Sequence, residues 1–109
     1  MKSSRPNILM VMADQLSAQY LGAYGHPLVK TPNIDALAAK GTIFRNAYCN
    51  SPICAPSRAS LATGLHVSRL GAFDNGSDFP AGVPTFMHHL RRANYEVALS
   101  GKAHFIGPD

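Results

Sequence analysis

Residues 8–14 read I-L-M-V-M-A-D, a continuous apolar run that ends in an acidic residue. Such a short unbroken run is typical of a central parallel strand that is buried on both faces. It falls well below the ~20 apolar residues of a membrane span, and Asp14 ends it before a signal-peptide core is complete. We therefore expect a buried strand at residues 8–13 in a cytoplasmic protein that has no membrane partner.

Helix and strand patterns alternate along the rest of the chain. The clearest helix is expected from Pro32, with Thr31 as its N-cap and with Lys40 and Gly41 closing it. β-branched and aromatic residues, helical spacing of apolar residues, and Gly or Pro punctuation mark the other elements. These are a strand at residues 42–48, a short helix at residues 59–62 that Gly64 ends, a long loop at residues 65–82, a helix at residues 84–93 and a strand at residues 95–99.

This alternation predicts an α/β fold with a mainly parallel central sheet flanked by helices. Ligand sites in such sheets form beyond the carboxyl ends of the strands. Asp14 follows the first expected strand, and Lys102 and His104 follow the third, so we expect all three at one edge of the sheet. Three strands and three helices would leave sheet edges uncovered, and residues 1–109 are therefore expected to be an incomplete, N-terminal part of a larger domain.

Composition and charge narrow the function classes. The chain is 46% hydrophobic and 15% charged, which indicates a globular rather than a disordered chain. Its net charge of +4 suits an anionic substrate, but the basic residues are scattered, so a nucleic-acid-binding module is the weakest interpretation. The two cysteines, Cys49 and Cys54, match neither a disulfide framework nor a zinc site. Cys49 is expected to be a small buried apolar residue.

The motif that carries chemistry is C-x-P-S-R at residues 54–58, followed by L-A-T-G at residues 61–64. It resembles the signature of the type I, formylglycine-dependent sulfatases of the alkaline phosphatase superfamily, in which the cysteine is oxidised to formylglycine. P-N-I-D-x-L at residues 32–37 and G-K-x-H at residues 101–104 extend the resemblance along the chain. M-A-D-Q-L at residues 12–16 and G-A-F-D-N at residues 71–75 are most similar to choline sulfatases.

The resemblance implies a sulfuric ester hydrolase that acts on a small-molecule sulfate ester. A formylglycine-generating enzyme would convert Cys54, and the hydrated aldehyde would be the nucleophile. One hydroxyl attacks sulfur and the alcohol leaves; loss of the second hydroxyl proton then expels sulfate and restores the aldehyde. Splitting one difficult displacement into two steps is covalent catalysis. Residues 1–109 would be the N-terminal part of the sulfatase catalytic domain.

The residue types around Cys54 suit this chemistry. We expect Cys54 at a helix N-terminus, where backbone N–H groups favour anions. Arg58 lies one helical turn on, so its planar guanidinium is expected beside position 54. By the resemblance, Lys102 and His104 are the pair that contacts sulfate and assists the leaving oxygen. The same match assigns a sulfate contact to Asn75.

A divalent cation is expected beside the nucleophile. Asp14 offers a hard oxygen ligand that suits Ca²⁺ or Mg²⁺. Sulfatases commonly carry two adjacent aspartates here, whereas this chain has Asp14-Gln15. Gln15 can still give a neutral oxygen, and the resemblance adds position 54 to the ligand set. The family's remaining metal ligands come from late in its sequence.

Two rival interpretations stay open. A phosphonate or phosphate monoester hydrolase of the same superfamily shares the nucleophile motif, and turnover of aryl sulfate against aryl phosphonate would separate the two. An inactive truncated fragment, or a relic gene product, would lack half of the metal site. The sequence leaves open whether copies of the chain form a homo-oligomer.

Overall fold

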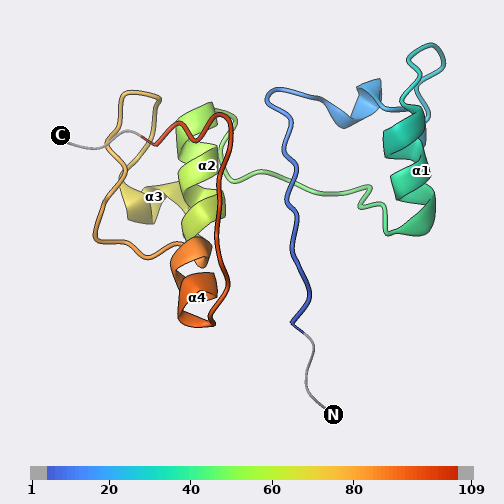
Figure 1. Cartoon of the computed structure of the whole chain (residues 1–109). Helices are drawn as coiled ribbons and strands as arrows, with labels where there is room; N and C mark the ends of the chain where they lie inside the picture. The colour runs from blue at the N-terminus through green and yellow to red at the C-terminus, as the bar shows by residue number, and fades with distance from the viewer. Residues whose placement is uncertain (1–4, 106–109) are drawn as a thin grey trace. The chain divides into compact units, whose positions relative to one another are not determined.

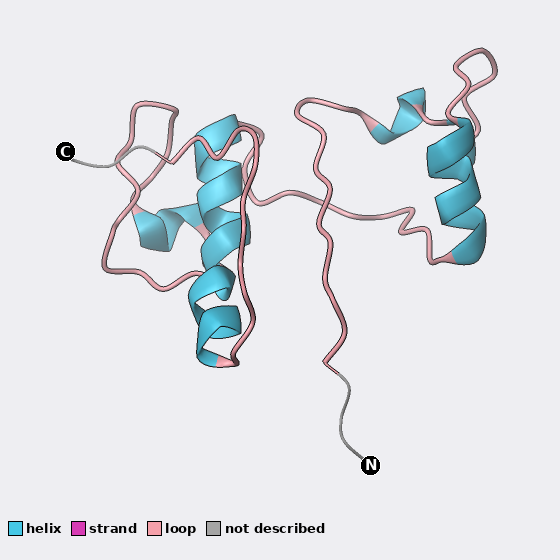
Figure 2. Cartoon of the chain, viewed as in Figure 1, coloured by secondary structure: helices cyan, strands magenta, loops and turns pink. Residues whose placement is uncertain are grey.

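A computed structural model of the chain describes residues 5–105, which form helices, turns and loops (Figure 2). The chain divides into two compact units, Met1–Asn46 and Ala47–Asp109. The first unit contains the 3₁₀ helices η1 (Ala18–Tyr20) and η2 (Gly22–Tyr24) and the helix α1 (Pro32–Lys40) (Figure 1). The second contains α2 (Cys54–Thr63), α3 (Val67–Leu70) and α4 (Phe86–Arg92).

In the first unit, α1 is joined to η2 by polar contacts at its start. Thr31 is the N-cap and Pro32 opens the helix, as the sequence predicts. The Thr31 hydroxyl does not cap α1; it accepts a hydrogen bond from the Gly22 N–H at 2.9 Å and donates to Asp35 at 2.9 Å. Asp35 also accepts from the Ala23 N–H at 2.7 Å. A Cβ at Gly22 would lie 2.5 Å from an Asp35 carboxylate oxygen, so a larger residue here would displace the Asp35 side chain from its hydrogen bonds.

The second unit is organised around α2, which contacts both α3 and α4 (Figure 1). Its core is a small apolar cluster of Ala59, Leu70 and Ala72, against which Leu65, Phe79 and Val83 pack. Small alanine side chains on α2 allow α3 to approach closely, and Ala59 is only 2% exposed. At its C-terminal end α2 stops at Gly64, whose left-handed φ of 71° favours glycine. The predicted stop at Gly64 is confirmed.

Helix boundaries differ from the sequence prediction in three places. The helix expected at residues 59–62 begins earlier, at Cys54, because Pro56 sits in the first turn, where its missing N–H is not needed. A short helix, α3, interrupts the predicted loop at residues 65–82. The last helix spans Phe86–Arg92, within the predicted residues 84–93, and starts with a capping box between Thr85 and His88.

The three predicted strands, at residues 8–13, 42–48 and 95–99, are not present in the part of the chain that the structure describes. A parallel strand needs hydrogen-bonding neighbours in its sheet and helices over both faces. Residues 8–12 have neither among residues 5–105, and Leu9 and Val11 are 88% and 85% exposed. The apolar pattern predicts which side chains the segment would bury in a sheet. It does not ensure that neighbouring strands are present, and without them the segment forms no strand.

None of the helices within residues 5–105 is long and apolar enough to cross a bilayer.

Candidate active site

Cys54 is the first residue of α2, and its side chain is half-buried. The preceding residue, Ile53, is the N-cap, with an extended backbone (φ −106°, ψ 143°) and no side-chain capping bond. The start of α2 therefore presents backbone N–H groups and the positive end of the helix dipole, which favour anions. The predicted place of Cys54 at a helix N-terminus is confirmed.

Asn75 supplies the hydrogen bond that this helix start lacks. Pro56 has no N–H, and the N–H of Ser57 donates to the Ile53 carbonyl oxygen at 3.0 Å. The N–H of Ala55 donates to the side-chain oxygen of Asn75 at 2.9 Å. Because Ala55 is buried, leaving that N–H unpaired would cost about 1–3 kcal/mol. Asn75 thus contacts the backbone directly beside Cys54, although 20 residues separate the two bonded residues.

A tight polar turn holds Asn75 in place. The Ser77 hydroxyl oxygen accepts from the N–H groups of Phe73 and Asp74 at 3.1 and 3.2 Å. The same hydroxyl donates to the Asp74 carboxylate at 2.8 Å, and the Gly76 N–H donates to that carboxylate at 2.9 Å. These bonds, first the one from Ser77 and then the one from Gly76, lower the pKa of Asp74 from its usual 3.8.

Arg58 joins α2 to the segment that carries Lys102. It lies on the helical turn after Cys54, and its Nη1 donates to the Lys102 main-chain oxygen at 2.7 Å. A charge-assisted bond of this length holds the two segments together across 44 positions of sequence. Both residues make further interactions. The structure therefore brings Arg58 to the main chain of Lys102, and the predicted contact of both side chains with sulfate stays a prediction.

His104 combines an unusual backbone with an unpaired ring nitrogen. Its φ is 55°, a region that residues other than glycine rarely adopt. Its Nδ1 is buried and has no hydrogen-bond partner among the residues that the structure describes. Strained backbone and an unsatisfied buried polar atom together are typical of functional positions.

Asp14 and Gln15 lie in the first unit, in an exposed turn. Gln15 has a φ of 52°, which bends the chain sharply after the apolar run. Asp14 makes an interaction within the chain. Lys102 and His104 belong to the second unit, so the predicted meeting of Asp14 with them at one sheet edge stays a prediction.

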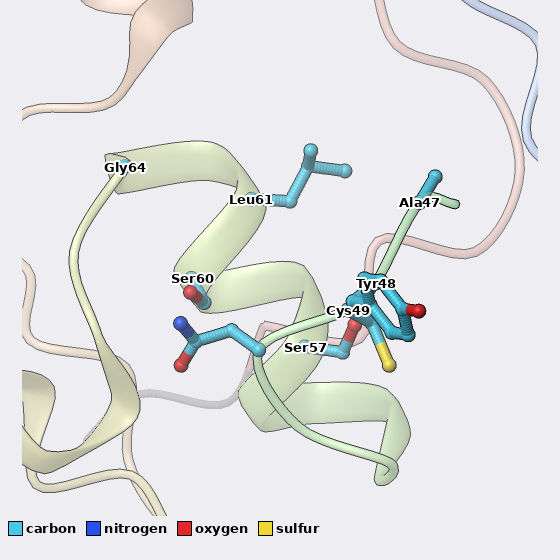
Figure 3. A pocket seen from close by; sticks show the side chains of 8 residues that line it. Ala47, Tyr48, Cys49, Ser57, Ser60, Leu61 and Gly64 are labelled. Carbon is cyan, nitrogen blue, oxygen red and sulfur yellow. The ribbon is translucent and has the colours of Figure 1, made fainter. Parts of the chain in front are cut away.

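A hollow of about 570 Å³ lies beside α2 on the side lined by residues 47–50 (Figure 3). Cys49 lines this hollow and is exposed, so the prediction that Cys49 is buried is wrong. The reason is that the segment before α2 is not a strand covered by other layers. The lining residues are Ala47, Tyr48, Cys49, Asn50, Ser57, Ser60, Leu61 and Gly64.

Residues 6–107 match the profile of the family described as Sulfatase. The chain belongs to the sulfatase family. This sulfatase chain is 45% identical to a choline-sulfatase of Rhizobium meliloti (strain 1021), over all of this chain and 21% of that protein.

Two solved structures share the fold of the sulfatase chain. The first is a phosphonate monoester hydrolase of Agrobacterium radiobacter, with a TM-score of 0.80 and 39% identity, over 84% of this chain and 18% of that one. The second is a putative sulfatase of Bacteroides thetaiotaomicron, with a TM-score of 0.79 and 35% identity, over 86% of this chain and 21% of that one. The sulfatase chain thus spans about a fifth of the length of the curated relatives it matches.

The metal site expected from the sequence is not assembled within residues 5–105 of the sulfatase chain. No group of three or more His, Cys, Asp or Glu residues between positions 5 and 105 could hold a metal ion. Asp14 and Gln15 would supply two oxygen atoms, whereas Ca²⁺ and Mg²⁺ take six or more ligands. These two residues do not by themselves fit the ion, because they leave most of its ligand positions unfilled.

The sequence interpretation of this sulfatase missed the parts played by Asp74 and Ser77. They contact no predicted reacting group, and they build the turn that presents Asn75 to α2. The signal was present in the sequence, because Asp, Asn, Gly and Ser in succession are typical turn residues. The composition of the turn did not indicate that Asn75 would contact the start of α2.

Proposed function

We propose that the whole protein is a sulfuric ester hydrolase whose nucleophile is formylglycine at position 54. The observation that carries the proposal is the set of contacts at the start of α2. Asn75 bonds to the residue after Cys54, and Arg58 bonds to Lys102. Three of the predicted site residues, Asn75, Arg58 and Lys102, thus take part in two hydrogen bonds to or from α2, the helix that begins with Cys54, inside a chain of the sulfatase family.

Formylglycine supplies an aldehyde whose hydrate is a nucleophile that a cysteine side chain cannot provide. The residues around it have distinct proposed tasks. The start of α2 stabilises negative charge near position 54 through its N–H groups. Arg58 and Lys102 bring positive charge to a sulfate group, with the Arg58 guanidinium held in direction by its bond to the Lys102 carbonyl oxygen. His104, with an unpaired Nδ1, is proposed to exchange a proton with the leaving oxygen.

The proposed substrate class is a sulfate monoester, such as choline sulfate or another alkyl, aryl or sugar sulfate. The relative at 45% identity is a choline-sulfatase, and another relative, at 38% identity, is an N-acetylglucosamine-6-O-sulfatase. A phosphonate or phosphate monoester is the second candidate, favoured by the TM-score of 0.80 to a phosphonate monoester hydrolase. Relative kcat/KM for an aryl sulfate and an aryl phosphonate, with the matured protein, decides between them.

Several finer features belong to the same proposal. Residues 1–109 would be the N-terminal part of the catalytic domain, in which residues 8–13 join a mainly parallel sheet. Asp14, Gln15 and position 54 would contribute to a Ca²⁺ or Mg²⁺ site whose other ligands lie elsewhere in the protein. A formylglycine-generating enzyme would be a partner during maturation. The cytoplasmic location rests on the sequence alone.

Mass analysis of one tryptic peptide tests the nucleophile. Cleavage after Arg45 and Arg58 releases residues 46–58, which contain both cysteines. After alkylation, protein from the native host should carry one alkyl group on this peptide, at Cys49. Position 54 should be lighter than cysteine by roughly 18 Da, the change from CH₂SH to CHO. Two alkyl groups in well-expressed protein would contradict the proposal and favour the inactive relic. Cys49 serves as an internal control for complete alkylation.

A further inference from the structure

The start of α2 depends on a side chain from another part of the chain. The helix α4 caps itself, because the Thr85 side chain bonds within its own first turn and His88 bonds back to the Thr85 N–H at 3.1 Å. The N-cap of α2, Ile53, has no side chain that could do this. The Ala55 N–H instead donates to Asn75 at 2.9 Å. The first turn of the helix that begins with the candidate nucleophile is therefore fixed by a residue 20 positions away in the sequence.

Asn75 makes this contact through its side-chain oxygen, and this distinguishes the contact from one with sulfate. A side-chain amide has a carbonyl oxygen that accepts and an NH₂ group that donates. Contact with a sulfate group, which the sequence resemblance implies, would use the NH₂ group. The contact in the structure uses the oxygen, and it leads to the main chain of α2. The two tasks can therefore be separated by substitution.

We propose that Asn75 is a positioning residue for the nucleophile: through the Ala55 N–H, it fixes the first turn of α2 and with it the direction of side chain 54. The turn around Ser77 and Asp74 makes this effective, because four side-chain hydrogen bonds within residues 73–77 limit the movement of Asn75. The inference rests on the proposed function for its catalytic consequence. The contact itself does not depend on that function.

Hydrogen exchange of the Ala55 amide measures the contact directly. In the matured protein at its natural length, Asn75→Ala removes the acceptor. The Ala55 amide should then exchange about fivefold faster, the change expected for loss of one capping bond. Asn75→Asp keeps an acceptor oxygen and loses the NH₂ group, so exchange should stay within about twofold of wild type. Asp78→Asn, an exposed position in the same loop, is the matched control and should leave exchange unchanged.

A second variant keeps the test decisive if Asn75→Ala does not fold. Ser77→Ala removes three of the bonds that hold the turn, so the Ala55 amide should exchange at least about twofold faster.

For sulfate ester hydrolysis, Asn75→Ala should lower kcat about tenfold with a smaller change in KM, because a misdirected nucleophile affects the reaction more than binding.

The outcomes separate this proposal from the proposed function. Unchanged exchange in Asn75→Ala, or equal acceleration in Asn75→Ala and Asn75→Asp, overturns the positioning role. Loss of kcat without faster exchange overturns it too, since the contact would then be with substrate. If the wild-type protein hydrolyses no sulfate ester, the proposed function fails, and the exchange comparison still decides whether Asn75 holds α2.

Discussion

The two units of the chain bury very different amounts of side chain. In the second unit, Ala55, Ala59 and Leu70 are buried and the site residues are tied together by specific bonds. In the first unit, none of the described residues 5–46 is buried, and the apolar run before Asp14 faces outward. The difference teaches that the surroundings of Cys54, the candidate nucleophile, are assembled by contacts within residues 47–105. The candidate metal ligands Asp14 and Gln15 sit in a region that completes no core within its own residues.

The largest effect is expected from substitution of Cys54, at the start of α2 in the second unit. Cys54→Ala should lower sulfate ester hydrolysis at least about 10³-fold, because it removes the proposed nucleophile. Cys49→Ala is the matched control: the side chain is exposed beside α2 and is assigned no catalytic part. It should keep activity close to that of wild type. Steady-state kinetics of the two purified variants make the comparison, and comparable losses in both would contradict the assignment of position 54.

Arg58→Lys tests whether the bond between α2 and the Lys102 segment contributes more than charge. Lysine keeps the positive charge but loses the planar fork that reaches the Lys102 carbonyl oxygen. We expect kcat/KM to fall about 10²-fold. Arg69→Lys, at an exposed position at the end of α3, should change it less than about twofold. An active Arg58→Lys enzyme would show that positive charge alone suffices.

The first unit is tested by Asp14→Asn, which removes a charge but keeps an oxygen. After treatment with a chelator, activity is restored by titration with CaCl₂ or MgCl₂. The variant should need about tenfold more of the ion for half of its maximal activity, since a neutral oxygen is a weaker ligand for a hard cation. Asp78→Asn should match wild type. Equal ion requirements for all three proteins would remove Asp14 from the proposed metal site.

The smallest effect is expected for the pH dependence of stability in Asp74→Asn, a substitution in the turn that presents Asn75. The hydrogen bonds to Asp74 lower its pKa in the folded state. Their contribution to stability is therefore present above the usual value of 3.8 and is lost as the pH falls through the lowered pKa. Asp74→Asn keeps the acceptor but cannot ionise. Its deficit in Tm against wild type should be visible at pH 7 and should shrink in acid below pH 3.8. A deficit that grows in acid would reverse the sign and contradict this account.

The sequence by itself determined the features that depend on neighbouring residues. Thr31, Pro32 and Gly41 set the ends of α1, and Gly64 ends α2 because only glycine readily adopts that φ. The motif at residues 54–58 also placed Cys54 and Arg58 one turn apart on a helix start. Hydrogen bonds within a few residues and the restricted φ of Pro and Gly are local, so a linear pattern records them.

Only the tertiary structure decided which distant groups meet. That Asn75 bonds to the Ala55 N–H, and Arg58 to the Lys102 carbonyl oxygen, follows from how α2 and its neighbours pack. The exposure of Cys49 and the outward-facing apolar run at residues 8–12 also depend on which layers surround them. An apolar pattern says what a segment can bury, but hydrogen-bonding neighbours and covering layers are long-range contacts, and those exist only in three dimensions.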